Sequence, residues 1–243
     1  MVITSQTPVR DIAVEYPTAI PVLERLGIDY CCGGKHTLAE ACTKGDVDLA
    51  PVLEELERQQ RNTNAPETQW QNAPLKEITE YLVQRHHAFT REQIKLIGDL
   101  MKKVEASHGA DHPEVFEIGK VFAVTSSELT HHFFCEENIL FPYIGKMEAG
   151  QQAALPPVFG SVEQPITRMM MDHDQAGEEL RALRGLTNDY TPPTAACPTW
   201  RALYRALEDL EQDLHQHIHL ENNILFPRAL AQARAPELST EKA

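Results

Sequence analysis

The sequence lacks any apolar run long enough to cross a bilayer, and Met1 to Thr7 lack the apolar core of a secretory signal peptide. It is also short of basic residues, with 22 lysines and arginines against 36 aspartates and glutamates and a formal net charge of −14. Because phosphate contacts require clustered lysine and arginine, this balance argues against a nucleic-acid partner. We therefore expect a cytoplasmic protein with no membrane segment and no bound nucleic acid.

Cysteine is scarce too, with five residues in a chain of 243. An odd number without regular spacing argues against a secreted disulfide scaffold and suits a reducing cytoplasm. The lack of a cysteine set also argues against an iron–sulphur cluster held by the chain itself. The length allows one sizeable domain and a second, small one.

What the sequence does contain is one phrase used twice. His132 and Glu136, followed by x-Asn-Ile-Leu-Phe-Pro, recur 85 positions later as His217 and Glu221 with the same continuation. Residues four apart share one face of an α-helix, with Cβ atoms about 6 Å apart, so an imidazole and a carboxylate can converge on one metal ion. A surface His–Glu pair beside an apolar run would explain one copy. Two copies in matching frames favour a two-metal site.

Two further histidines precede these phrases at nearly equal distances. His87 lies 45 positions before His132, and His173 lies 44 positions before His217. Each falls on a mostly apolar helix face, where a lone histidine is usually a hydrogen-bonded core residue. The matching frames favour metal ligands instead. His86 is the rival of His87 on the neighbouring stripe, but it has no counterpart in the second half of the chain.

The spacing of these residues also predicts the topology. The midpoints between successive ligand positions fall in breaker-rich stretches at residues 107–113, 150–157 and 190–198. Turns at these places define an all-α, up-down-up-down four-helix bundle whose ligands face inward at one height. The expected ligands are His87, His132, Glu136, His173, His217 and Glu221.

This ligand set suits two iron ions. Imidazole together with carboxylate favours first-row metals such as iron, zinc or manganese. Two carboxylates among four histidines can bridge a metal pair and leave positions for an oxo, hydroxo or small exogenous ligand. Glu128 and Asp213 precede His132 and His217 by four positions, so they are candidate carboxylates that orient these imidazoles. An equally good interpretation is that Glu128 and Asp213 are solvated acids on the surface.

The chain divides into a small helical domain, a polar linker and the bundle, at residues 1–60, 61–73 and 74–235. In the small domain, Cys31 and Cys32 lie before Gly33-Gly34 and a predicted helix N-terminus. Backbone amides there would lower the pKa of a thiol, which makes the pair a candidate redox site. Two small residues that fill a tight turn are an equally good interpretation. The other cysteines are expected to be structural: Cys42, Cys135 and Cys197.

The two phrases, with the histidines that precede them, resemble the haemerythrin-like di-iron bundle. The run Asp-Tyr-Cys-Cys-Gly-Gly-Lys at residues 29–35 resembles the small domain fused to that bundle in the RIC (repair of iron centres) family. These are iron–sulphur cluster repair di-iron proteins of the YtfE, ScdA and DnrN type. The resemblance extends from about residue 8 to residue 230, and the family pattern maps onto the same six ligands.

The resemblance implies a cytoplasmic stress-response protein with two non-haem iron ions, bridged by carboxylate and by oxo or hydroxo. Such a protein restores iron–sulphur clusters damaged by oxidative or nitrosative stress, by supplying iron or by handling nitric oxide. A reversible oxygen or nitric oxide binder or sensor is one alternative, and a di-iron nitric oxide reductase is another. Oxygen carriers use more histidine and have no need of a Cys-Cys domain, so repair is favoured. The expected partners are damaged iron–sulphur proteins, nitric oxide and oxygen, with a second copy of the chain as a further candidate.

Overall fold

The computed structural model describes residues 2–62, 70–151 and 161–234, and their regular secondary structure is helical apart from one isolated bridge between Pro8 and Thr37. The prediction of an all-α fold is confirmed. Across these residues, no helix is both long enough and apolar enough to cross a membrane. Two compact units are formed, one by residues 1–74 with 215–231 and the other by residues 75–214 with 232–243. The linker predicted at residues 61–73 lies partly outside the described residues.

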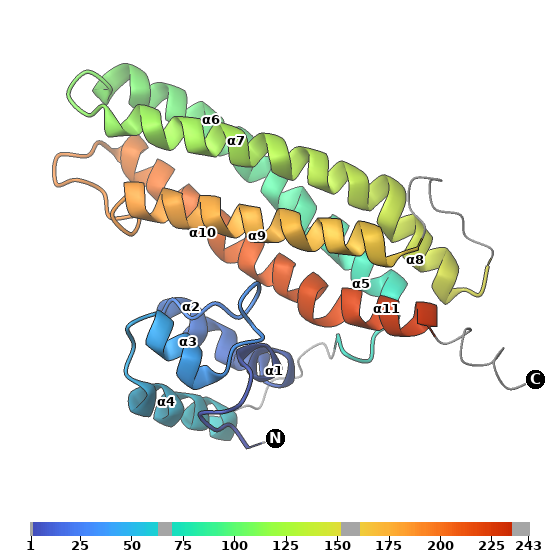
Figure 1. The fold of residues 1–243 in the computed structure, drawn as a ribbon. Coiled ribbons are helices and arrows are strands. Elements are labelled where there is room, and N and C mark those ends of the chain that lie inside the picture. Colours follow the sequence, from blue (N-terminus) through green and yellow to red (C-terminus); the bar gives the residue numbers. More distant parts are fainter. Residues whose placement is uncertain (1, 63–69, 152–160, 235–243) are drawn as a thin grey trace, which may run out of the picture. The chain divides into compact units, whose positions relative to one another are not determined.

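Long helices dominate the second unit. They are α6 (Ala88–His108), α7 (Glu114–Cys135), α9 (Glu163–Leu186) and α10 (Pro198–Leu220), the last of which ends in the first unit. In Figure 1 these helices lie side by side, and the loops that follow α6 and α9 are at the same end. This is the arrangement expected of antiparallel neighbours joined by short turns.

Helix α10 shows why the bundle packs. Its buried residues Trp200, Leu203, Leu207, Leu210 and Leu214 recur every three or four positions, which places them along one face. They belong to one apolar cluster with residues of α6, α7 and α9. Burying each leucine side chain contributes about 1.5–3 kcal/mol, so this stripe holds α10 against its neighbours.

Short π-helical segments interrupt the helices that carry predicted ligands. They are η2 (Leu82–His87), η3 (Glu136–Leu140) and η4 (Glu221–Leu225), and the helices that flank them are α5 (Leu75–Tyr81), α8 (Phe141–Glu148) and α11 (Phe226–Arg234). The amide of Phe141 donates to the carbonyl of Glu136, five residues back, and Phe226 donates to Glu221 in the same way. Each segment therefore begins or ends at a predicted ligand, as π turns often do at functional sites.

Pro142 and Pro227 close the two phrases. Each is the second residue of a helix, in α8 and α11 respectively. A proline at the start of a helix is tolerated, because the first amides have no partner within the helix. The chain therefore changes its hydrogen-bond register before each proline and remains helical.

The first unit has its own apolar core. Its short helices are α1 (Val9–Glu15), η1 (Pro17–Ala19), α2 (Ile20–Arg25), α3 (Leu38–Lys44) and α4 (Leu49–Asn62). Buried Ile12, Leu23 and Leu56 hold these helices together. Helix α3 begins with a capping box, in which the Thr37 hydroxyl accepts the amide of Glu40 at 3.2 Å and the Glu40 carboxylate accepts the amide of Thr37 at 2.8 Å.

Candidate metal centre

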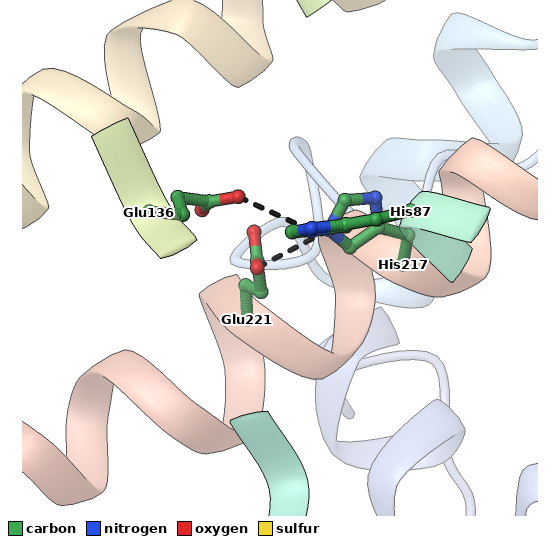
Figure 2. A group of neighbouring side chains, drawn as sticks. All are labelled: His87, Glu136, His217 and Glu221. Atoms are coloured by element: carbon green, nitrogen blue, oxygen red, sulfur yellow. Dashed lines mark hydrogen bonds and ion pairs between the residues drawn. The ribbon is translucent and has the colours of Figure 1, made fainter. Parts of the chain in front are cut away.

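Two buried groups of histidine and glutamate have ligand atoms within 4.8 Å of one another. The first consists of His87, Glu136, His217 and Glu221, and the second of His132, Glu136, His173 and Glu221. Figure 2 shows the first group, whose four side chains point toward one another. Both glutamates belong to both groups, whereas each histidine belongs to one. The six residues named from sequence spacing are thus brought together by the fold.

Glu136 lies between two histidines from different helices. Its Oε2 is 3.4 Å from Nε2 of His87, and its Oε1 is 3.2 Å from Nε2 of His132. A carboxylate whose two oxygens face different imidazoles has the geometry of a bridge between two metal ions. In di-iron bundles, glutamates and histidines from facing helices form such sites.

The remaining ligands close the site from the other helices. Oε1 of Glu221 is 3.2 Å from Nε2 of His217, and the Nε2 atoms of His132 and His173 are 3.1 Å apart. All of these side chains are buried. Burying carboxylates costs several kcal/mol per ion unless positive charge compensates. Metal cations would supply that charge, so the donor set fits a pair of them.

His87 is held in place by groups outside the metal centre. Its Nδ1 is hydrogen-bonded to Oε1 of Glu137 at 2.7 Å, and the same oxygen accepts from Arg91 at 2.8 Å. Burial alone would raise the pKa of Glu137, but the hydrogen bonds from His87 and Arg91 outweigh it and lower that pKa. The His87 ring also stacks on Phe133, with ring centroids 4.1 Å apart. An ionised Glu137 keeps the proton on Nδ1, which leaves Nε2 for a metal.

Asp172 has the same position relative to His132. Its Oδ2 is 3.5 Å from Nδ1 of His132, and its Oδ1 is 3.0 Å from the guanidinium of Arg168. Burial would raise the pKa of Asp172, but the hydrogen bond from His132 and the charge of Arg168 lower it. The fold therefore supplies a carboxylate behind one histidine of each group.

Comparison with known proteins agrees with this geometry. Residues 77–229 match the family model described as hemerythrin HHE cation binding domain, and residues 5–60 match ScdA_N, described as a domain of unknown function. The iron-sulfur cluster repair protein YtfE of Escherichia coli O157:H7 is 40% identical over 225 residues, which are 92% of this chain and 96% of that protein. The YtfE proteins of Cronobacter sakazakii and Citrobacter koseri are 41% and 40% identical over the same shares.

The chain belongs to the YtfE-type family of iron–sulphur cluster repair proteins. The cation-binding domain and the two buried groups together indicate a di-metal site in this family member.

The two carboxylates expected to orient the ligands have other partners in this YtfE-type chain. His86 Nδ1 is hydrogen-bonded to Oδ2 of Asp213 at 3.0 Å, and Arg85 pairs with Oδ1 of Asp213 at 3.1 Å. Partial desolvation, a hydrogen bond with Glu179 and the charges of Glu179 and Asp172 raise the pKa of Glu128.

Glu137 and Asp172, which sequence reasoning missed, lie against the Nδ1 atoms of His87 and His132. Each is the chain neighbour of a ligand, since Glu137 follows Glu136 and Asp172 precedes His173. Each acts on a histidine of another helix, so spacing within one helix could not reveal it. The adjacency of an acid to a ligand is the signal that could have found both.

His86 and His87 offer a test of the helix register. His86 is in neither group, because its ring is buried against Asp213 and against the edge of Tyr81, 5.4 Å away between ring centroids. We expect His87→Ala to lose metal and His86→Ala to keep two ions per chain. His86→Ala should still lower the free energy of unfolding by about 1–3 kcal/mol, because buried Asp213 loses a partner. Metal analysis and denaturant titration of both variants measure these effects. Metal loss in His86→Ala alone would reverse the assignment.

Cys31 and Cys32 form a third group with Asp29. The Oδ1 atom of Asp29 accepts the amides of Cys31 and Cys32 at 3.1 and 2.9 Å, and the two sulphurs are 3.8 Å apart. The hydrogen bond with Cys32, burial and the negative charge of Asp29 raise the pKa of the Cys31 thiol well above its ordinary value. The expectation of a lowered pKa is wrong for Cys31, because a carboxylate occupies the amides and helix α3 begins only at Leu38.

Proposed function

We propose that this chain repairs iron–sulphur clusters damaged by oxidative or nitrosative stress by means of two non-haem iron ions. The observation that carries this proposal is that two buried glutamates belong to both ligand groups, while the four histidines divide into two pairs. One ion would be held by His87 and His217, and the other by His132 and His173. Glu136 and Glu221 would bridge them, together with an oxo or hydroxo group.

The chain's own residues prepare this site in three ways. Glu137 and Asp172 fix the protons on Nδ1 of His87 and His132, so that each Nε2 faces the centre. The π segments that begin at Glu136 and Glu221 set these carboxylates at the register change of their helices. Complete burial excludes bulk water, so charges within the site interact strongly. Bound iron would supply either the metal for a damaged cluster or a binding position for nitric oxide.

The partners that follow from this proposal are damaged iron–sulphur proteins and small diatomic ligands. Two imidazoles and one oxygen from each shared carboxylate would give each iron four protein donors, so a position would remain for a small ligand beside the oxo or hydroxo bridge. Nitric oxide or oxygen is small enough to use it. The YtfE relatives are named for iron–sulphur cluster repair, which supports the same assignment for this chain.

The test is the recovery of an iron–sulphur hydratase that has been inactivated with nitric oxide. The iron-loaded full chain should restore its activity, whereas the metal-free chain and the iron-loaded Glu136→Ala preparation should not. Equal recovery with the metal-free chain, or with free ferrous iron at the same concentration, would contradict the proposal. Steady consumption of nitric oxide with an electron donor, without recovery of the hydratase, would assign the chain to the reductase class instead.

A further inference from the structure

Cys197 lies at the N-terminal end of α10. It directly precedes Pro198, the first residue of α10, and its carbonyl accepts the amide of Arg201 at 3.1 Å. The thiol therefore occupies the position where a serine or threonine hydroxyl commonly caps a helix. His217 lies 20 positions further along the chain, which is about 30 Å of helix. Cys197 is thus remote from the metal centre.

An imidazole lies against this thiol. Nε2 of His108, the last residue of α6, is 3.2 Å from Sγ of Cys197. The His108 ring packs on buried Trp200, with centroids 5.0 Å apart, so its orientation is fixed. A cysteine and a histidine at hydrogen-bond distance can share one proton, which leaves a thiolate beside an imidazolium.

The surroundings favour the thiolate. The amide of Trp200 and the hydrogen bond with His108 lower the pKa of Cys197 to about 7. The N-terminus of a long helix adds a positive end. His112 packs on the edge of Trp200, and its Nδ1 is bonded to Glu114 at 2.8 Å. Arg201, four residues after Cys197, donates to the carbonyls of Ala196 and Thr194 at 3.2 Å. The thiol is half-buried, so small reagents can reach it.

We propose that Cys197 and His108 form a reactive thiolate–imidazolium site that is oxidised by hydroperoxides, of which hydrogen peroxide is the simplest. The sulphur attacks one peroxide oxygen, so a sulphur–oxygen bond forms as the oxygen–oxygen bond breaks. The departing hydroxide takes the proton from Nε2 of His108 and leaves as water. Sulphur loses two electrons and the peroxide gains them, which yields a sulphenic acid beside a neutral histidine.

The sulphenic acid of Cys197 has no partner cysteine within reach in the same compact unit. Cys135 is the other cysteine of that unit, and it ends α7 at the far end from the α6–α7 turn, about 30 Å along the helix. A disulfide requires Cα atoms within about 7 Å. The sulphenic acid should therefore persist or be capped by a small thiol. Spacing within the sequence gave no sign of this pair, because its two residues are 89 positions apart.

Alkylation of the full chain with limiting iodoacetamide tests the thiolate, with each cysteine quantified by peptide mass spectrometry from pH 6 to pH 9. Cys135 is the matched control, because it is half-buried and has His131 Nε2 at 3.7 Å, yet its side chain accepts no capping hydrogen bond from a helix amide. At pH 7 a thiol of pKa 7 is about half ionised, against ~3% for an ordinary thiol. Cys197 should thus react about tenfold faster than Cys135, with a midpoint near pH 7. His108→Asn should move that midpoint upward.

Hydrogen peroxide followed by dimedone, a reagent for sulphenic acids, tests the oxidation itself. An adduct at Cys197 should form in the metal-free full chain, weaken in His108→Asn and be absent in Cys197→Ser. If His108→Asn fails to fold, the pH profile of the unmodified chain still decides. A Cys197 rate at pH 7 no greater than that of Cys135, or rapid alkylation without a dimedone adduct, would overturn the proposal.

Discussion

Replacing Glu136 with alanine is expected to abolish the two-iron centre while the helices remain. The side chain reaches His87 with one oxygen and His132 with the other, so its loss removes a donor from both ions at once. We expect the iron content to fall from two ions to less than about half an ion per chain, because few protein donors would remain for each ion. Metal analysis and Mössbauer spectroscopy measure the loss, and circular dichroism measures the helices.

The matched control for this experiment is Glu117→Ala. Glu117 lies on the same helix, α7, with 58% of its side chain exposed, and it pairs with Lys120 at the surface. It should retain two irons. In the metal-free chain, Glu136→Ala removes the cost of a buried carboxylate and leaves a small cavity. The melting temperature should therefore fall by no more than the cost of that cavity. Retention of two coupled irons in Glu136→Ala would refute the bridging assignment.

The second large effect is expected from Cys31→Ser with Cys32→Ser in the full chain. This variant should keep two irons, because none of the six proposed ligands is changed, and it should lose repair of the nitric-oxide-damaged hydratase. The physical reason is that Asp29 and the two sulphurs form a group whose ligand atoms lie within 4.8 Å of one another, close enough to hold a metal ion. Repair is measured as recovered hydratase activity, and iron content is measured on the same preparation.

A control for the double variant is Cys42→Ala, since Cys42 is buried in the apolar core of the first unit. It should repair as well as the parent chain does. If the double variant also repairs as well as the parent chain does, the thiol pair only fills a turn and takes no part in repair. Loss of iron together with loss of repair would instead show that the pair supports the metal centre.

The segment that holds Cys31 and Cys32 also contacts the helical stretch that carries the candidate ligand Glu221. Asn222 and Asn223 follow the ligand Glu221, and their side chains donate to the carbonyls of Cys31 at 3.4 Å and Tyr30 at 3.0 Å. Glu24 accepts from His215 at 3.0 Å in the same unit. The sequence predicts a bundle over residues 74–235, whereas residues 215–231 cluster with residues 1–74 in the structure.

The candidate ligands could be named from the sequence because their signal is local and repeated. A histidine and a glutamate four positions apart must share a helix face, and the second copy supplies the frame for His87 and His173. Partners from other helices leave no such signal. The contact of Glu137 with His87 depends on how the helices that carry them pack. The raised pKa of Cys31 depends first on its hydrogen bond with Cys32 and on its burial, with a smaller contribution from Asp29.

The π segments suggest what the shared ending of the two phrases encodes. The Asn138 side chain donates to the carbonyl of Phe134 at 2.8 Å, and Pro142 follows without an amide hydrogen of its own. An α-helix turns by about 100° per residue, so the extra residue in each wider turn sets the rotational phase of the glutamate against the helix beyond it. Deleting one residue between Asn138 and Leu140 would restore the narrower pitch. It would rotate α8 by about 100° relative to α7 and Glu136, although all six predicted ligands would still be present in the chain.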